Sequence, residues 1–188
     1  MSINNRIGRS SNRESIKPWR IAAYSVSLGA LILMCAILQT SGLSFFGKTP
    51  ALTFSLVCAI GFIMGDKWGA VWGIIGGVAT DIIGGVGFSF SPVVYMFCGY
   101  CCGAFVGWFL SKNLPSFIAY ALISGAFKEI FTFIYFGLFS KEFFSLKILL
   151  DVVLPEYLAY ILCILPAYFA VLAVFSLFKG KDKRERQR

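Results

Sequence analysis

The chain has 188 residues, of which 58% are hydrophobic, 20 are Phe and none is His. Its mean hydropathy of +0.79 exceeds what a soluble domain of this size can bury, and its long apolar runs are typical of transmembrane segments. These runs are apolar throughout, whereas barrel strands alternate apolar and polar residues. The sequence therefore predicts an all-α integral membrane protein and excludes a soluble domain.

The net charge of +8 lies entirely in the two tails, because six basic and six acidic residues balance between positions 21 and 178. Basic tails beside transmembrane helices are typical of cytoplasmic segments, and they attract anionic lipid headgroups. We therefore expect anionic lipids, and no nucleic acid, as partners of the tails.

Six apolar stretches predict about six transmembrane helices in a single domain at residues 19–178. The flanking segments 1–18 and 179–188 are predicted to be basic cytoplasmic tails, the first of them disordered. In chain order the predicted helices cover residues 19–39, 50–64, 68–84, 92–110, 114–138 and 155–178. The second and third are short for a hydrocarbon core of ~30 Å, so we expect them to be oddly tilted, broken or sheltered by protein.

The segment 143–153 lies between the last two predicted helices and is apolar apart from Lys147 and Asp151. This composition is consistent with a helix that lies on the bilayer surface. With both termini in the cytoplasm, thirteen of the 17 Lys and Arg residues lie inside and three outside, while Lys128 lies within a helix. This distribution follows the positive-inside rule and predicts cytoplasmic termini.

Two series of glycines are spaced four residues apart in apolar sequence. The first reads Gly65, Gly69, Gly73, Gly77, Asp81 and Gly85, and the second Gly99, Gly103 and Gly107. Steps of four trace one ridge of a helix, and glycine on such a ridge lets two helix backbones approach closely. The ridge drifts by ~40° per step, so positions 69 to 81 roughly share a face but positions 65 and 85 do not. We predict helix-docking faces toward partner proteins at Gly69, Gly73, Gly77, Gly99, Gly103 and Gly107.

Asp81 lies near the outer end of the third predicted helix, where an ionisable residue is costly and needs a reason. One interpretation makes it a polar anchor that accepts hydrogen bonds from the glycine-rich turn at residues 84–91 or from a partner subunit. The other makes it an acid at the membrane interface that reaches headgroup water.

Lys128, Glu129 and Glu156 are further ionisable residues in the last two predicted helices. Adjacent helical residues project about 100° apart, so we do not expect Lys128 and Glu129 to pair. Lys128 either forms an ion pair with Asp81 or Glu156 across helices, or extends to an interface while Glu129 faces a polar seam. Glu156 follows Pro155 at a helix start, where an acid complements the positive helix end.

No catalytic or cofactor signature accompanies these residues. The chain lacks a His base, paired carboxylates at a defined spacing and a phosphate-binding loop, and no predicted strand precedes its glycines. Cys98, Cys101 and Cys102 have a spacing that superficially resembles a metal site, but small buried hydrophobes on a helix explain them better. We predict a non-enzymatic protein without metal or cofactor.

The order of these elements resembles the MreD family of rod-shape-determining membrane proteins. That family has spaced glycines leading into an Asp, then a glycine-containing turn, then an aromatic-rich helix with a Gly-Tyr-x-x-Gly element. The corresponding residues here are Gly69, Gly73, Gly77, Asp81, the Gly84-Gly85-Val86-Gly87 turn and Gly99-Tyr100-Cys101-Cys102-Gly103. The last helix, which opens Leu154-Pro155-Glu156-Tyr157 and ends in a basic tail, is also similar. The turn after Asp81 is longer and more polar than the family pattern, and the N-terminal tail is longer.

The resemblance implies a non-enzymatic subunit of the bacterial cell-elongation machinery in the plasma membrane. Such proteins bind the single-pass scaffold MreC within the membrane. Through MreC they couple the cytoplasmic, actin-like MreB to the peptidoglycan polymerase and transpeptidase outside. The family is also similar in fold to the S components of energy-coupling-factor transporters.

That similarity leaves an alternative, a substrate-binding S component of a vitamin transporter. S components commonly carry small residues every four positions in the first helix, and this chain has no clean series there. An S component also needs an outward-facing pocket with polar or aromatic ligands, which Asp81, Tyr95 and Lys128 are candidates to supply.

Overall fold

The computed structural model describes residues 18–41, 49–85, 89–108, 113–139 and 153–185, and within these ranges the chain is all-α. The helices in chain order are α1 (Pro18–Thr40), α2 (Leu52–Met64), α3 (Asp66–Ile83), α4 (Ser91–Trp108), α5 (Leu114–Phe139) and α7 (Leu154–Glu185). These bounds agree with the predicted ones to within two residues, except that α7 continues to Glu185 through most of the predicted C-terminal tail. The predicted disordered tail and surface helix lie outside the described residues, apart from Pro18 and Val153.

Prolines set the start of four helices. Pro18, Pro92, Pro115 and Pro155 each lie at the first or second position of a helix. Proline suits the first turn because its missing N–H would have no helical acceptor there and its fixed φ is already helical. The apolar runs that follow these prolines therefore fold as helices from a defined residue.

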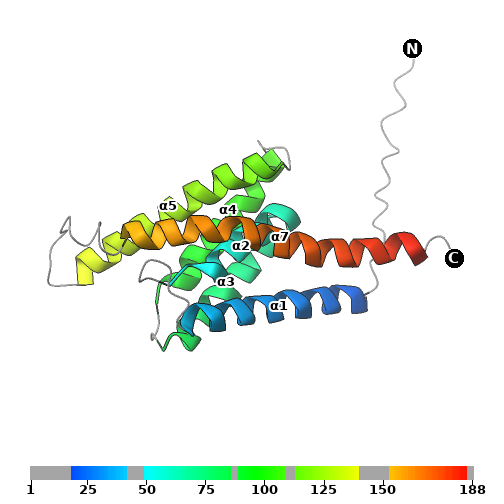
Figure 1. Cartoon of the computed structure of the whole chain (residues 1–188), viewed down its shortest axis with the longest axis horizontal. Helices are drawn as coiled ribbons and strands as arrows, with labels where there is room; N and C mark the ends of the chain where they lie inside the picture. Colours follow the sequence, from blue (N-terminus) through cyan, green and yellow to red (C-terminus); the bar gives the residue numbers. More distant parts are fainter. Residues whose placement is uncertain (1–17, 42–48, 86–88, 109–112, 140–152, 186–188) are drawn as a thin grey trace, which may run out of the picture.

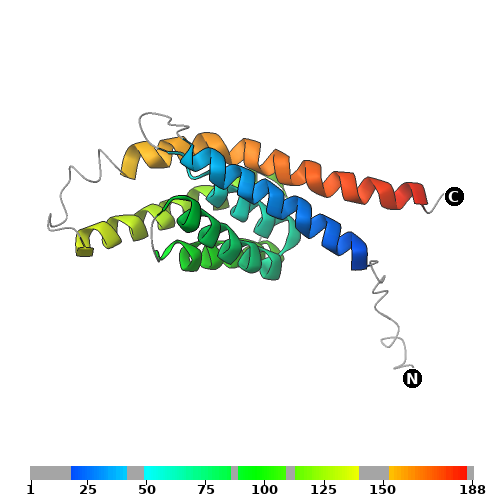
Figure 2. The same cartoon turned by 90° about the horizontal axis from the view of Figure 1, so that it is seen from below.

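Three helices in the described ranges are long and apolar enough to cross a membrane, which indicates a multi-pass membrane protein. The apolar windows within them are Ala22–Thr40, Leu114–Ile134 and Leu154–Ser176. Two shorter apolar helices accompany them at Leu52–Met64 and Ser91–Val106. The described start of α1 and end of α7 lie at the same end of the molecule in both views (Figures 1 and 2).

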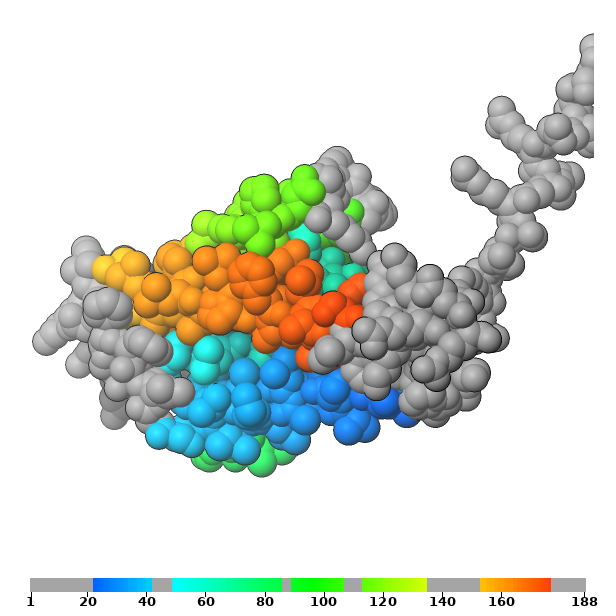
Figure 3. Space-filling model, turned by 45° about the vertical axis from the view of Figure 1, so that its right-hand side comes forward, coloured from blue at the N-terminus to red at the C-terminus, as the bar shows by residue number. Residues whose placement is uncertain are grey.

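The short helix α2 lies at the centre of the bundle and contacts α1, α3, α4, α5 and α7. Every residue from Thr53 to Phe62 is buried. A helix of 13 residues rises only about 20 Å, so α2 is shorter than the ~30 Å thickness of a hydrocarbon core. The expectation that the second predicted helix is sheltered by protein is confirmed. Figure 3 shows α1 in blue and α7 in orange on one face, with part of α2 in cyan visible between them.

Aromatic side chains connect α2 to its neighbours. The Phe54 ring lies 5.0 Å from that of Tyr95 on α4 and 5.6 Å from that of Tyr160 on α7, measured between centroids. Two turns further along, the Phe62 ring lies 5.3 Å from that of Phe117 on α5. Such ring pairs add specific geometry to the apolar burial, so they fix the depth at which each outer helix packs on α2.

Candidate functional site

The first glycine series faces α4. A Cβ atom on Gly73 would lie 2.7 Å from the backbone nitrogen and Cα of Met96, and one on Gly77 would lie 2.6 Å from the nitrogen of Pro92. A Cβ atom on Gly69 would meet the backbone of Gly99. Backbone atoms cannot move aside as a flexible side chain can, so these positions accept only glycine. The series packs α3 against α4 along about two turns, from Gly69 to Gly77.

The second series completes the same interface from the other side. A Cβ atom on Gly99 would lie 2.8 Å from the carbonyl carbon of Gly69, and one on Gly103 would meet the backbone of Gly65 and Asp66. Gly107 lies in the last turn of α4, and its surroundings fall outside the described residues. The faces predicted to dock partner proteins are therefore occupied within the chain at five of the six positions. The spacing identifies a small-residue face but does not identify the helix that packs on it.

Gly61 on α2 joins this interface, although it was not among the predicted positions. A Cβ atom on Gly69 would lie 2.8 Å from the Cα of Gly61, and one on Gly61 would meet the carbonyl oxygen of Gly99. Three helices therefore meet at three glycines. The signal was present in the sequence, because Gly61 precedes Gly65 by four residues and extends the first series backwards.

A single residue, Gly65, separates α2 from α3. Its φ of 107° lies in a region that residues with a side chain rarely adopt. The Gly65 N–H donates to the Gly61 carbonyl at 2.9 Å, and the Gly65 carbonyl accepts from the Gly69 N–H at 3.0 Å. The predicted break at residues 65–67 is therefore one residue long, because Asp66 and Lys67 already belong to α3.

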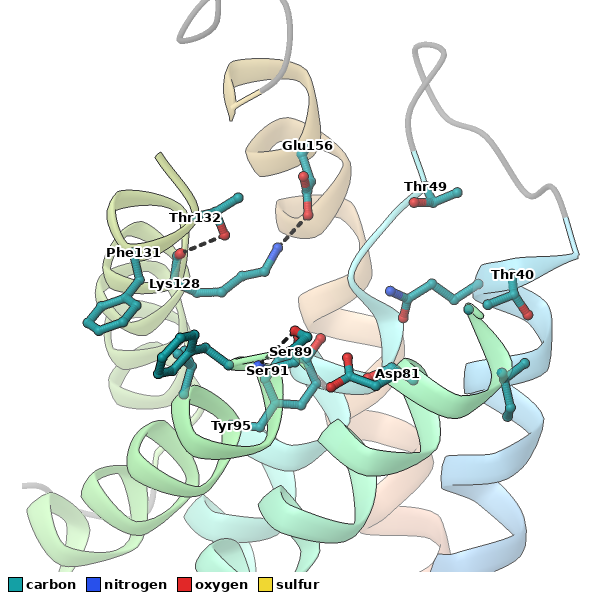
Figure 4. A pocket seen from close by; sticks show the side chains of 16 residues that line it. Thr40, Thr49, Asp81, Ser89, Ser91, Tyr95, Lys128, Phe131, Thr132 and Glu156 are labelled. Carbon is teal, nitrogen blue, oxygen red and sulfur yellow. Dashed lines mark hydrogen bonds and ion pairs between the residues drawn. The ribbon is translucent and has the colours of Figure 1, made fainter. Parts of the chain in front are cut away.

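Where the first glycine series ends, the helices diverge around an open cavity of about 650 Å³. Its walls come from the ends of α1 and α3, the starts of α4 and α7, and the second half of α5 (Figure 4). Asp81 comes four residues after Gly77, beyond the end of the close contact between α3 and α4. It therefore lines the cavity instead of packing in the glycine interface. Among the described residues of the wall, the charged ones are Asp81, Lys128 and Glu156.

Lys128 is held between two carboxylates. Its Nζ pairs with Glu156 Oε1 across α5 and α7, and lies 2.9 Å from Glu129 Oε1 on its own helix. The predicted Lys128–Glu156 alternative is confirmed, whereas the expectation that Lys128 and Glu129 do not pair is wrong. Their backbone positions do diverge, but the four-carbon stem of lysine lets its ammonium group reach the neighbouring carboxylate.

Glu129 is not among the described residues that line the cavity. Its side chain is buried at 4% exposure, and its Oε2 has no hydrogen-bond partner among the described residues. It lines a second, mostly apolar pocket of about 290 Å³ with Tyr157 and Val153. The interpretation that Glu129 faces a polar seam is therefore only half right, because its Oε1 meets Lys128 while Oε2 meets apolar surroundings.

Asp81 stands apart from the Lys128 group. Among the described residues no hydrogen bond or ion pair joins its carboxylate to another side chain, so the Lys128–Asp81 alternative is not the one formed. Part of the turn predicted to bond it, residues 86–88, lies outside the described residues. Figure 4 shows Asp81 and Lys128 projecting from different walls of the cavity.

Ser89, Ser91 and Tyr95 add neutral polar groups to the wall. The hydroxyls of Ser89 and Ser91 lie 2.7 Å apart, and the Ser91 N–H donates to Ser89 Oγ at 3.1 Å. The Tyr95 side chain is buried beneath them, as expected for a pocket-lining aromatic. The described part of the chain contains no group of three or more His, Cys, Asp or Glu side chains that could hold a metal ion. The six cysteines are free thiols.

Comparison of the chain with protein-family models, with curated proteins and with solved structures finds no match.

Proposed function

We propose that this chain is a non-enzymatic membrane subunit of the bacterial cell-elongation machinery that docks an MreC-like scaffold protein. The proposal includes six transmembrane helices of an S-component-like fold in the plasma membrane, with both termini cytoplasmic. Its partners are the scaffold, and through it a peptidoglycan polymerase and transpeptidase outside and an MreB-like cytoskeleton inside. The observation that carries it is the hairpin of α3 and α4. The whole motif order that resembles MreD, from Gly69 to Gly103, lies in this one unit.

At five of the six predicted glycines the docking surface cannot be the glycine face, since α3 and α4 cover each other there. The outward side of the hairpin offers a second apolar surface. Large side chains recur on α3 at three- and four-residue steps and are exposed, namely Val71, Ile74, Ile75, Val78 and Ile82. We assign the docking of a single transmembrane helix to this row. The glycines act indirectly, because they hold the hairpin closed and so fix the row as one continuous face.

A site-specific photo-crosslinker tests this assignment. Ile82, at 74% exposure, lies in the row, and Ile123 on α5, at 68%, is a control of the same residue type and similar exposure on another helix. After ultraviolet irradiation of bacterial membranes, we expect a scaffold adduct from position 82 and none from position 123. Equal adducts from both would mean that the row is only lipid-facing surface.

Affinity purification followed by mass spectrometry tests the function itself. The proposal expects a single-pass scaffold with a coiled-coil segment outside the membrane. Purification with the ATP-hydrolysing subunits of a transport module, and without such a scaffold, would contradict it and favour the S-component alternative.

A further inference from the structure

The cavity at the end of the glycine interface has the size and chemistry of a ligand site. Its volume of about 650 Å³ is many times the roughly 30 Å³ that a water molecule occupies in the liquid. It is open, and it combines apolar wall with hydroxyl, amide and charged groups from five helices. Concave sites of this kind, apolar with a few convergent polar groups, are typical of small-ligand binding.

The charge of the wall selects the sign of the ligand. Lys128 is the only basic residue in the described wall, and Glu156 already neutralises it. Asp81 then leaves the described part of the wall with a net charge of −1, even when Glu129 carries a proton. If Glu129 is ionised, the surroundings are more negative still. An anionic ligand would have to displace a carboxylate from Lys128, whereas a cation meets at Asp81 a carboxylate that no described side chain pairs.

The neutral groups around Asp81 also suit a cation. Hydroxyl oxygens of Ser89 and Ser91 accept hydrogen bonds from an ammonium group, and the buried Tyr95 forms the wall beneath them. Figure 4 shows these groups gathered beside Asp81, with the Lys128–Glu156 pair on the opposite side. We propose that this cavity binds a cationic nitrogen group, a primary ammonium or a guanidinium, with Asp81 as its counter-ion. The site is independent of the docking row on α3.

Three compounds with one aromatic body and different charge test the proposal: phenethylamine, 2-phenylethanol and 3-phenylpropionate. Titration calorimetry on the full chain in lipid nanodiscs is expected to show binding of the amine only. Asp81→Asn keeps the size of the side chain and removes its charge, and should weaken amine binding at least tenfold. Asp66→Asn is the matched control, because Asp66 is the acid at the other end of the same helix and does not line the cavity.

Binding of the propionate as tightly as the amine, or equal weakening by Asp81→Asn and Asp66→Asn, would overturn the proposal. The chain's own lysines give a further decisive outcome. The triple variant Lys48→Ala, Lys141→Ala, Lys147→Ala removes three of them. If this variant binds phenethylamine and the unaltered chain does not, a lysine of the chain itself is the cation at the site, and the proposal of an external ligand is wrong.

A cationic group can come from a free amine or from a basic side chain of a partner protein. Native mass spectrometry of the purified chain would reveal a free amine as an added small mass. If the cation is instead a basic side chain of a partner protein, excess phenethylamine should release that protein from the chain. The Asp81→Asn variant should then fail to capture it. Either result supports the site. Scaffold capture that persists when phenethylamine fails to bind would sink the site while leaving the docking function intact.

Discussion

Lys128 on α5 forms an ion pair with Glu156 in the first turn of α7, and the same ammonium group lies 2.9 Å from Glu129. The Lys128 side chain is 12% exposed, so little water is available to replace a lost partner. The pair connects two helices that the chain joins only through residues outside the described ranges. The Lys128–Glu156 pair therefore links α5 to α7 and also forms part of the cavity wall.

We therefore expect Lys128→Met to destabilise the protein by about 3–5 kcal/mol, because it leaves two carboxylates without their cation. Thermal unfolding in detergent, followed by size-exclusion chromatography with fluorescence detection, measures the loss. Adding Glu129→Gln and Glu156→Gln to Lys128→Met should restore most of it. Lys67→Met is the control, since Lys67 is exposed at the start of α3. A Lys128→Met variant as stable as Lys67→Met would show that the pair contributes nothing.

A graded alanine series tests the glycine interface. At Gly29 an added Cβ would lie 3.6 Å from the Trp72 ring, an ordinary contact, and at Gly76 it would lie 3.1 Å from Val57 Cγ2. At Gly73 it would run into the backbone of Met96. Overpacking costs about 1–3 kcal/mol when side chains can adjust and more when backbone must move. We expect melting temperatures to fall in the order Gly29→Ala, Gly76→Ala, Gly73→Ala. A Gly73→Ala protein as stable as Gly29→Ala would contradict the close α3–α4 packing.

Much of this fold is readable from the sequence. Apolar runs opened by proline give the helix starts. Gly65 and Gly85 lie outside α3, with φ of 107° and 64°, so the ridge drift expected for one continuous helix stays a prediction at these two positions. These features follow from local geometry, which a single sequence contains.

The incorrect predictions concern which helices and side chains contact each other, not where the helices begin and end. The spacing of Gly99 and Gly103 does not say whether the helix that covers them belongs to the same chain. Backbone angles alone disfavour a Lys128–Glu129 pair, but the length of a lysine side chain allows it. The cavity was not predictable as a whole, because its wall combines residues from Gln39 to Glu156 that only the tertiary fold brings together.

The packing of α5 on α7 depends on Gly125 and Tyr160. A Cβ atom on Gly125 would lie 2.8 Å from Tyr160 Cδ1, and Tyr160 is buried. We expect Gly125→Ala to cost about 1–3 kcal/mol, and Tyr160→Leu to relieve part of that cost in the double variant. Chemical denaturation of the four proteins in the double-mutant cycle measures the coupling. Additive losses would mean that the two residues do not share a contact.

Tyr160→Phe removes the hydroxyl and keeps the ring, so it separates their contributions to stability. The Tyr160 hydroxyl donates to the Ala121 carbonyl at 2.8 Å, and this carbonyl also accepts from Ser124 Oγ at 3.0 Å. Because the carbonyl keeps a partner, we expect a loss of only about 1 kcal/mol, well below that of Gly125→Ala. The same denaturation measurement decides it, and a larger loss for Tyr160→Phe would assign the stability to the hydroxyl rather than to the packing of the ring.

The side of the membrane on which the cavity opens follows from charge and from the position of the chain ends. The basic tails are expected in the cytoplasm, and the start of α1 and end of α7 lie together at the end of the bundle away from the cavity (Figures 1 and 4). Ser89 lines the cavity and Lys67 begins α3 at the other end. In intact spheroplasts a membrane-impermeant maleimide should therefore label Ser89→Cys at least tenfold faster than Lys67→Cys, with the unaltered chain as control for its own six cysteines. Permeabilisation should remove the difference, because both sides are then accessible. Faster labelling of Lys67→Cys in intact spheroplasts would reverse the topology, and the cavity would then face cytoplasmic ligands only.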